Sequence, residues 1–158
     1  MSTNPYAKYL GNDDPQPVIA ATPGRLAELT RGLDAARLTK APAPGKWSLR
    51  DIFCHLADCE IAFGFRLRQA LAEPKHMIQP FDQDDWAAPY NHFDAATALA
   101  TFTALRKWNC DLIATVPPEG FSKPLTHPER GEMTFRTLVE TMGGHDRNHL
   151  LQVEALVR

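Results

Sequence analysis

Two histidines near the end of the chain are spaced so that both can bind one ion. In the stretch GGHDRNHLLQVE, His145 and His149 stand four residues apart. On a helix, residues at this spacing share one face, with Cβ atoms about 5–6 Å apart. Neutral histidine is the commonest protein ligand of metals such as zinc. The pair therefore predicts a divalent metal site on a helix.

The two histidines also occupy positions where a buried apolar residue is normal. In alternating steps of three and four residues, one face of the predicted helix carries Phe135, Leu138, Met142, His145, His149, Gln152 and Leu156. This spacing is typical of a helix packed in a bundle. Burying two imidazoles without partners is costly, so a metal or another polar group must meet them.

His55 is the candidate third ligand. It lies at the margin of the apolar face of an earlier predicted helix, about 40° around the axis from Cys59. If the two helices are neighbours, His55 faces the histidine pair. Three histidines that leave coordination positions open are typical of catalytic sites rather than closed structural ones. We interpret Cys59 first as a core residue and second as an occasional fourth ligand.

Three further polar residues are candidates for supporting roles. Arg66, two turns beyond Cys59, could neutralise a carboxylate of a thiol or substrate, or extend to solvent from the margin of the apolar face. Gln152 could hydrogen-bond a ligand, orient a histidine, or be satisfied by a neighbouring helix. Glu60 falls inside an apolar face, so it should have a polar partner or lie near the edge of that face.

The long connectors of the chain contain acidic, aromatic and histidine side chains. Residues 73–93 and 117–133 form connectors long enough for lids or binding loops. A lid or a solvated loop would equally use Asp82, Asp84, Asp85 and Trp86. The remaining histidines are predicted to lie at the surface: His76, His92 and His127.

The elements that must position these residues are four helices, because four segments carry helical periodicity and none alternates convincingly as a strand. They are predicted to begin near Thr22, Ser48, Asp94 and Thr134. Asp51 can complete a capping box with Ser48, and Pro117 ends the third helix. This pattern predicts an all-α antiparallel four-helix bundle in a single domain, with residues 1–17 as an irregular arm.

Composition excludes several classes of function. Lys and Arg total 17 and Asp and Glu total 19, so the net charge of −2 predicts no attraction to nucleic acid or to an anionic membrane. We expect neither a membrane span nor a signal peptide. The three cysteines are an odd number without a CxxC motif, which favours free thiols and a reducing cytoplasm.

Two other metal motifs fit less well. The sequence His145-Asp146-x-x-His149 is similar to the HExxH of zinc proteases, but Asp is one methylene shorter than Glu and almost no chain follows to supply a third ligand. A di-iron bundle requires Glu residues and ExxH pairs on facing helices, and those pairs are absent.

Several stretches together resemble the DinB/YfiT-like metalloenzymes. The strings PGKWSLRDIFCHLAD at 44–58 and GGHDRNHLLQVEAL at 143–156 resemble the family's histidine segments. QPFDQDDWA at 79–87 and THPERGEMTF at 126–135 are similar to the loops between them. The likeness extends from about residue 18 onward.

The resemblance implies a four-helix bundle whose metal, zinc or nickel, is held by His55, His145 and His149. Family members include S-transferases that use bacillithiol, relatives that use mycothiol or glutathione, among them a maleylpyruvate isomerase, and proteins labelled as hydrolases. Homodimers are common, and DNA binding is not implied. At Glu60 and Asn148 the chain lacks histidines that the YfiT-like branch would have.

We therefore predict a metal-dependent enzyme of small molecules, most similar to thiol S-transferases. It would use a low-molecular-weight thiol such as bacillithiol as co-substrate. A metal-dependent hydrolase is the second enzymatic hypothesis. A bundle that binds metal without catalysis, related to stress, is the hypothesis from another class.

Overall fold

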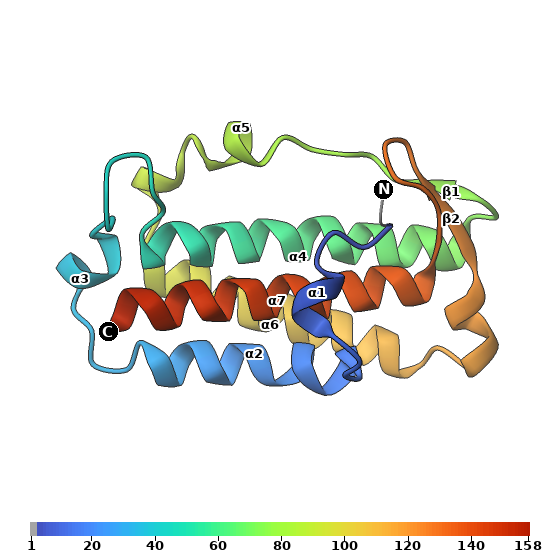
Figure 1. Cartoon of the computed structure of the whole chain (residues 1–158), viewed down its shortest axis with the longest axis horizontal. Coiled ribbons are helices and arrows are strands. Elements are labelled where there is room, and N and C mark those ends of the chain that lie inside the picture. Colours follow the sequence, from blue (N-terminus) through green and yellow to red (C-terminus); the bar gives the residue numbers. More distant parts are fainter. Residues whose placement is uncertain (1–2) are drawn as a thin grey trace.

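A computed structural model describes residues 3–158 and contains four long helices packed as a bundle (Figure 1). These are α2 (Pro15–Leu29), α4 (Leu49–Ala72), α6 (Ala95–Ala114) and α7 (Phe135–Val157). The predicted all-α bundle is confirmed. Among the described residues, no helix is long and apolar enough to cross a membrane.

The order of the helices around the bundle places the histidines. Both α4 and α2 pack against α6 and α7. Helices α4 and α7 are antiparallel, whereas α4 and α6 run in the same direction because the connector through α5 (Gln83–Ala87) returns along α4 (Figure 1). The first half of α4 therefore lies beside the middle of α7.

Three of the predicted helix starts are confirmed by their caps. Ser48 and Asp51 form the reciprocal capping box at the start of α4. The Asp94 side chain accepts a hydrogen bond at the start of α6, and Thr134 does so at the start of α7, where Thr137 reciprocates. These bonds satisfy backbone N–H groups that have no partner inside the helix.

The first long helix begins earlier than predicted. Asp14 caps α2 and Pro15 occupies its first position, a combination that favours helix initiation. Thr22 and Pro23 lie inside the helix, and Thr22 donates its hydroxyl hydrogen to the Val18 carbonyl at 2.9 Å. Interpreting Thr22-Pro23 as the start was therefore wrong, because the same cap signal occurs upstream.

The N-terminal arm is also more regular than predicted. It contains the short helix α1 (Ala7–Leu10), which lies across α7 (Figure 1). A Cβ on Gly144 would come within 2.5 Å of the Tyr6 carbonyl oxygen. Glycine at this position of α7 thus permits the close approach that holds the arm. Of the predicted irregular residues 1–17, residues 1 and 2 lie outside the described part of the chain.

A small sheet, which the sequence did not predict, closes one end of the bundle. Its strands are β1 (His76–Met77), β2 (Pro124–His127) and β3 (Gly131–Thr134). Strand β2 pairs in parallel with β1 and antiparallel with β3. Strands this short contain too few residues to display an alternating pattern, so the expectation of no strand was wrong.

Shorter helices complete the connectors. They are α3 (Ala35–Thr39), the 3-10 helix η1 (Tyr90–His92) and the 3-10 helix η2 (Pro118–Ser122).

The buried face of α6 differs from the apolar pattern in its sequence. Leu105 and Leu112 are only half-buried, while Arg106 and Asn109 are buried among the helices. Arg106 donates to the Glu60 carboxylate at 2.8 Å and to both carboxylate oxygens of Asp146. One guanidinium thus links α6 to α4 and α7. Of the two alternatives left open for Glu60, a polar partner or a place at the edge of the apolar face, the structure shows the first.

Candidate metal centre

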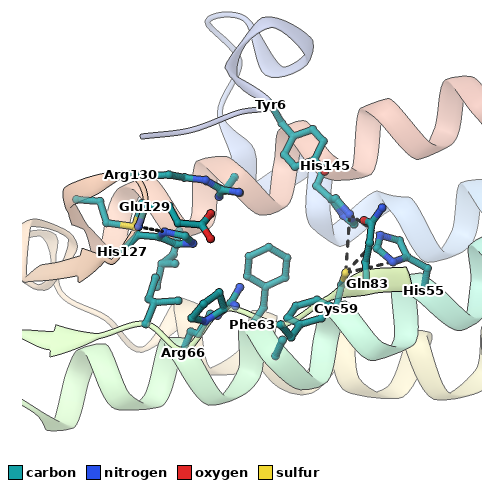
Figure 2. A pocket seen from close by; sticks show the side chains of 17 residues that line it. Tyr6, His55, Cys59, Phe63, Arg66, Gln83, His127, Glu129, Arg130 and His145 are labelled. Carbon is teal, nitrogen blue, oxygen red and sulfur yellow. Dashed lines mark hydrogen bonds between the residues drawn. The ribbon is translucent and has the colours of Figure 1, made fainter. Parts of the chain in front are cut away.

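The three predicted ligands converge in the interior of the bundle. His55 reaches from α4, and His145 and His149 reach from α7, as Figure 2 shows for the first two. The Nε2 atom of His145 lies 3.0 Å from that of His55 and 3.1 Å from that of His149. Each side chain is at most 4% exposed.

The spacing of these nitrogens fits a shared metal ion. Tetrahedral zinc with Zn–N bonds of about 2.0–2.1 Å holds its nitrogens about 3.3 Å apart. The two distances to His145 Nε2 lie close to that value, and the ring centroids of all three pairs are 4.4 to 5.1 Å apart. A small adjustment of side chains would therefore let the three donors share one ion.

Burial keeps these imidazoles neutral, which is the form that binds metals. Desolvation, together with the neighbouring His149, lowers the pKa of His55 to about 3. The pKa of His145 is lowered well below its ordinary value by burial and by the two neighbouring histidines. Burial also lowers the pKa of His149. The nitrogen lone pairs are therefore not lost to protons near neutral pH.

Gln152 fixes the orientation of His149. Its Oε1 lies 2.9 Å from Nδ1 of His149, and an amide oxygen can only accept, so Nδ1 carries the hydrogen. Nε2 of the neutral ring then presents a lone pair to the site. Gln152 itself is exposed and Val153 is buried in its place, so the predicted buried face of α7 turns after His149.

Cys59 lies within the site and not only in the apolar core. Its Sγ is 3.5 Å from Nε2 of His55 and 3.8 Å from Nε2 of His145. These three residues form a group that could hold a metal ion. Burial, and secondly the charge of Glu60, raise the pKa of the Cys59 thiol. The thiol is thus protonated in the metal-free protein, and its role as a ligand depends on whether a metal displaces that proton.

Aromatic rings enclose the histidines. Trp47 packs on His55 with ring centroids 4.7 Å apart and lies 6.4 Å from the ring of His149. The ring of Tyr6 meets His145 edge to face at 5.1 Å. Neither role was predicted, because Tyr6 lies in the arm expected to be irregular and Trp47 precedes its helix.

Two cavities border the site. His55, Cys59 and His145 line the smaller one, of about 210 Å³. His149 lines the larger one, of about 680 Å³. Tyr6 and Gln83 border both cavities. Each of the two cavities is therefore lined by at least one of the histidines and could admit a small molecule.

The connector before α6, interpreted from the sequence as either a lid or a solvated loop, contributes two residues to the cavities at the site. Gln83 borders both cavities and Asp84 borders the larger one. Asp82 instead caps α5, accepting from the backbone of Asp84 at 2.8 Å. Trp86 packs on Phe81 with ring centroids 4.4 Å apart. Gln83 and Asp84, rather than Asp82, Asp85 or Trp86, are therefore the residues of this segment that border the cavities beside the histidines.

The histidines of the connectors were predicted at the surface, and two of the three predictions were wrong. His76 and His127 are buried in the small sheet, whereas His92 is exposed. His127 borders the smaller cavity, and its Nδ1 accepts the backbone N–H of Glu129 at 3.1 Å. The sheet that buries them was not predicted, which explains the error.

Of the two remaining candidates, Arg66 lies at a cavity and Asp146 is buried in the bundle. Arg66 borders the smaller cavity on the same face of α4 as Cys59, and it donates to the Gln79 carbonyl at 2.8 Å. Asp146 is bound to Arg106 and fully buried, so its carboxylate is not free to act as the base of a zinc-protease motif.

The sequence of this chain matches those of known proteins in one family. A sequence model of the DinB superfamily matches residues 19–153. A protein of Oceanobacillus iheyensis named "Putative metal-dependent hydrolase" is 27% identical over 127 residues, which cover 80% of this chain and 74% of the relative. A protein of Bacillus mycoides with the same description is 25% identical over 135 residues, covering 85% of this chain and 78% of the relative.

A solved structure shares the fold. It is YfiT from Bacillus subtilis, described as "a probable metal-dependent hydrolase with an unusual four-helix bundle topology". The superposition has a TM-score of 0.82 at 21% identity and covers 99% of this chain and 87% of the other. The match covers nearly the whole chain, including its four long helices, so the two proteins share the bundle fold.

Proposed function

Because the chain belongs to the DinB superfamily, we propose that it is a metal-dependent enzyme of small molecules whose ion is held by His55, His145 and His149. The observation that carries the proposal is the convergence of three buried Nε2 atoms at a point bordered by two cavities. A structural metal site is closed by protein ligands, whereas a catalytic site keeps an open coordination position next to a pocket.

The bound metal, zinc or nickel, would act as a Lewis acid that lowers the pKa of a water or thiol. The residues of the chain bind the metal, orient its ligands and exclude water. Three neutral imidazoles donate lone pairs, and Gln152 holds His149 in the required tautomer. Trp47 and Tyr6 shield the histidines from bulk water.

Thiol transfer is the leading reaction of this proposal. It joins two molecules, a low-molecular-weight thiol such as bacillithiol and an electrophile, and the site borders two cavities. In that arrangement one cavity admits the thiol and the other the electrophile. Among the described residues, Glu129 is the one carboxylate that lines the smaller cavity, and Asp84 is the one that lines the larger cavity.

Metal-dependent hydrolysis is the second candidate. It is favoured by the descriptions of the relatives from Oceanobacillus iheyensis and Bacillus mycoides. The same three histidines would serve it, with water in place of the thiol. The non-catalytic alternative requires Cys59 to close the site as a fourth ligand.

Assembly as a homodimer in the cytoplasm completes the proposal. Ile61 and Phe65, on α4, are 51% and 53% exposed, and Trp108 of α6 is 65% exposed. These side chains offer apolar area to a second copy. All three cysteines are free, as expected in a reducing compartment.

Metal analysis of purified variants tests the ligand assignment. His149→Ala should abolish metal retention while leaving the helical circular dichroism signal unchanged, because two imidazoles do not complete the site. Cys59→Ala should retain the metal. Full metal content in His149→Ala together with its loss in Cys59→Ala would replace His149 by Cys59 as the third ligand, whereas loss in both variants would make Cys59 a fourth ligand.

Gln152 provides a finer test of positioning. Gln152→Leu removes the acceptor for His149 and should weaken metal affinity by roughly 10-fold to 100-fold. Gln152→Glu keeps an acceptor at the same place and should restore the affinity. Equal affinities in both variants would show that Gln152 does not orient His149.

Assays of the metal-loaded protein separate the reactions. Bacillithiol, mycothiol and glutathione analogues are each offered with an electrophile that changes absorbance on S-alkylation, and ester and amide substrates are offered in parallel. Turnover only with a thiol supports transfer, and turnover without one supports hydrolysis. No turnover with any metal, thiol or substrate would favour the non-catalytic bundle.

A further inference from the structure

The smaller cavity contains a second polar group, at the end away from the histidines. We infer that Arg66 and Arg130 together bind an anionic group, a carboxylate or phosphate, of the molecule whose reacting end lies at the histidines. The inference rests on the proposed function and specifies its substrate class. Figure 2 shows the two arginines on one side of this cavity and His55, Cys59 and His145 on the other.

Both arginines extend from defined elements of the fold. Arg66 extends from α4, donates one N–H to the Gln79 carbonyl at 2.8 Å, and lies over the ring of Phe81. Arg130 belongs to the tight turn between β2 and β3, where its backbone N–H bonds to the His127 carbonyl at 3.2 Å. Gly131 follows with a φ of 82°, a conformation that glycine adopts without strain.

The guanidinium groups lack a counter-ion within the protein. Neither arginine forms an ion pair with a carboxylate in the part of the chain that the structure describes. Arg66 has used one of five N–H donors on Gln79, which leaves others for a ligand. Two half-buried guanidiniums facing one cavity repel each other unless an anion lies between them.

The other charged groups at this end do not cancel the arginines. Glu129 borders the cavity but is exposed, and its charge opposes only one of the two cations. Burial, and secondly Arg130, lower the pKa of His127, so that side chain adds no charge near neutral pH. This end of the cavity therefore has a net positive charge.

The spacing along α4 sets the size of the molecule. Cys59 and Arg66 are seven residues apart, or about 10 Å along the helix axis at 1.5 Å per residue. Helical side chains lean toward the N-terminus, so the Arg66 side chain reaches back toward Cys59. A ligand that spans the cavity of about 210 Å³ thus has its anion roughly 10 Å or less from the reacting end.

A series of mercaptocarboxylic acids of increasing chain length tests this arrangement. Each acid is titrated into the cobalt-substituted protein beside its methyl ester and its phosphonate analogue, and the thiolate-to-cobalt absorption reports binding. An acid of matching length should bind roughly 10-fold to 100-fold more tightly than its ester. The phosphonates reveal whether the site prefers a phosphate-like group.

Matched variants test whether the preference for the acid over the ester depends on the two arginines. Arg66→Gln and Arg130→Gln should each remove the preference for the acid over the ester, while Arg31→Gln, an equal change of charge at an exposed position, should keep it. Circular dichroism and cobalt content confirm that each variant is folded and loaded. Binding of acids and esters with equal affinity in the unaltered protein, or the same preference in all variants, would overturn the inference.

A measurement without metal separates this inference from the proposed function. If no thiol reaches the cobalt, the proposed function fails, and the metal-free protein is titrated with inorganic phosphate and with glutarate by NMR. Weaker binding in Arg66→Gln and Arg130→Gln than in Arg31→Gln would still support the anion site. Equal binding in all three variants would refute it.

Discussion

At the scale of single residues, the site depends on imidazoles kept neutral by burial. His55, His145 and His149 are buried and meet one another through Nε2 atoms. Without a metal, protonation of any one of these rings would place a buried positive charge beside the other two rings. The same burial that prepares the site for a cation therefore makes the metal-free protein sensitive to acid.

We predict that the metal-free protein loses stability as the pH falls from 7 to 5. The pKa of His55 is lowered from 6.5 to about 3, so between these values the unfolded chain binds more protons than the folded protein. The free energy of unfolding therefore falls with falling pH in this window. At pH 5, His55 alone accounts for about 2 kcal/mol.

Urea unfolding at pH 5 and pH 7 measures this change. His55→Leu should show a smaller loss of stability between the two pH values, because the lowered pKa is removed along with the ring. An identical loss in the variant would mean that other groups cause the acid sensitivity.

At the scale of elements, the buried guanidinium of Arg106 joins three helices. Burial disfavours its charge, yet Asp146 and Glu60 outweigh burial and raise its pKa. Arg106 also donates to the Ile19 carbonyl at 2.8 Å, which connects α2 to the same group. Asp146, which belongs to this network, directly follows His145 on α7. The network therefore fixes the helix that contributes two of the proposed ligands.

We predict that Arg106→Leu destabilises the protein by about 3–5 kcal/mol, because two buried carboxylates lose their partner. Chemical denaturation gives the midpoint and the free energy of unfolding. Lys107→Ala, next to it on α6, removes an exposed pair with Asp111 and should leave the midpoint unchanged. Equal effects of the two substitutions would contradict a structural role for the buried network.

The sequence predicts elements that carry their own signals and misses those defined by tertiary contact. Ser48, Asp94 and Thr134 start helices through local caps, and the histidine pair is local too. The small sheet and Arg130 become visible only when strands from distant segments meet. Arg106 was hidden because a charged residue on an apolar face is usually assigned to the surface.

At the scale of the whole molecule, metal binding and folding are linked, because the ligands come from two helices. Metal at about 100 times its dissociation constant would add about 2.7 kcal/mol to stability. For a chain of this size we predict a rise in Tm of roughly 5–10 °C. Scanning calorimetry with and without zinc measures the rise, and His145→Ala should abolish it. A rise in that variant would place the ion elsewhere.

The docking of the arm on Gly144 has a practical consequence for preparing this protein. Tyr6, in this arm, packs against His145 and borders both cavities. An oligohistidine tag fused there would bring extra imidazoles within reach of the three-histidine centre. Purification on nickel resin could then load or strip the ion before it is ever measured, whereas a cleavable tag, removed before elemental analysis, avoids that artefact.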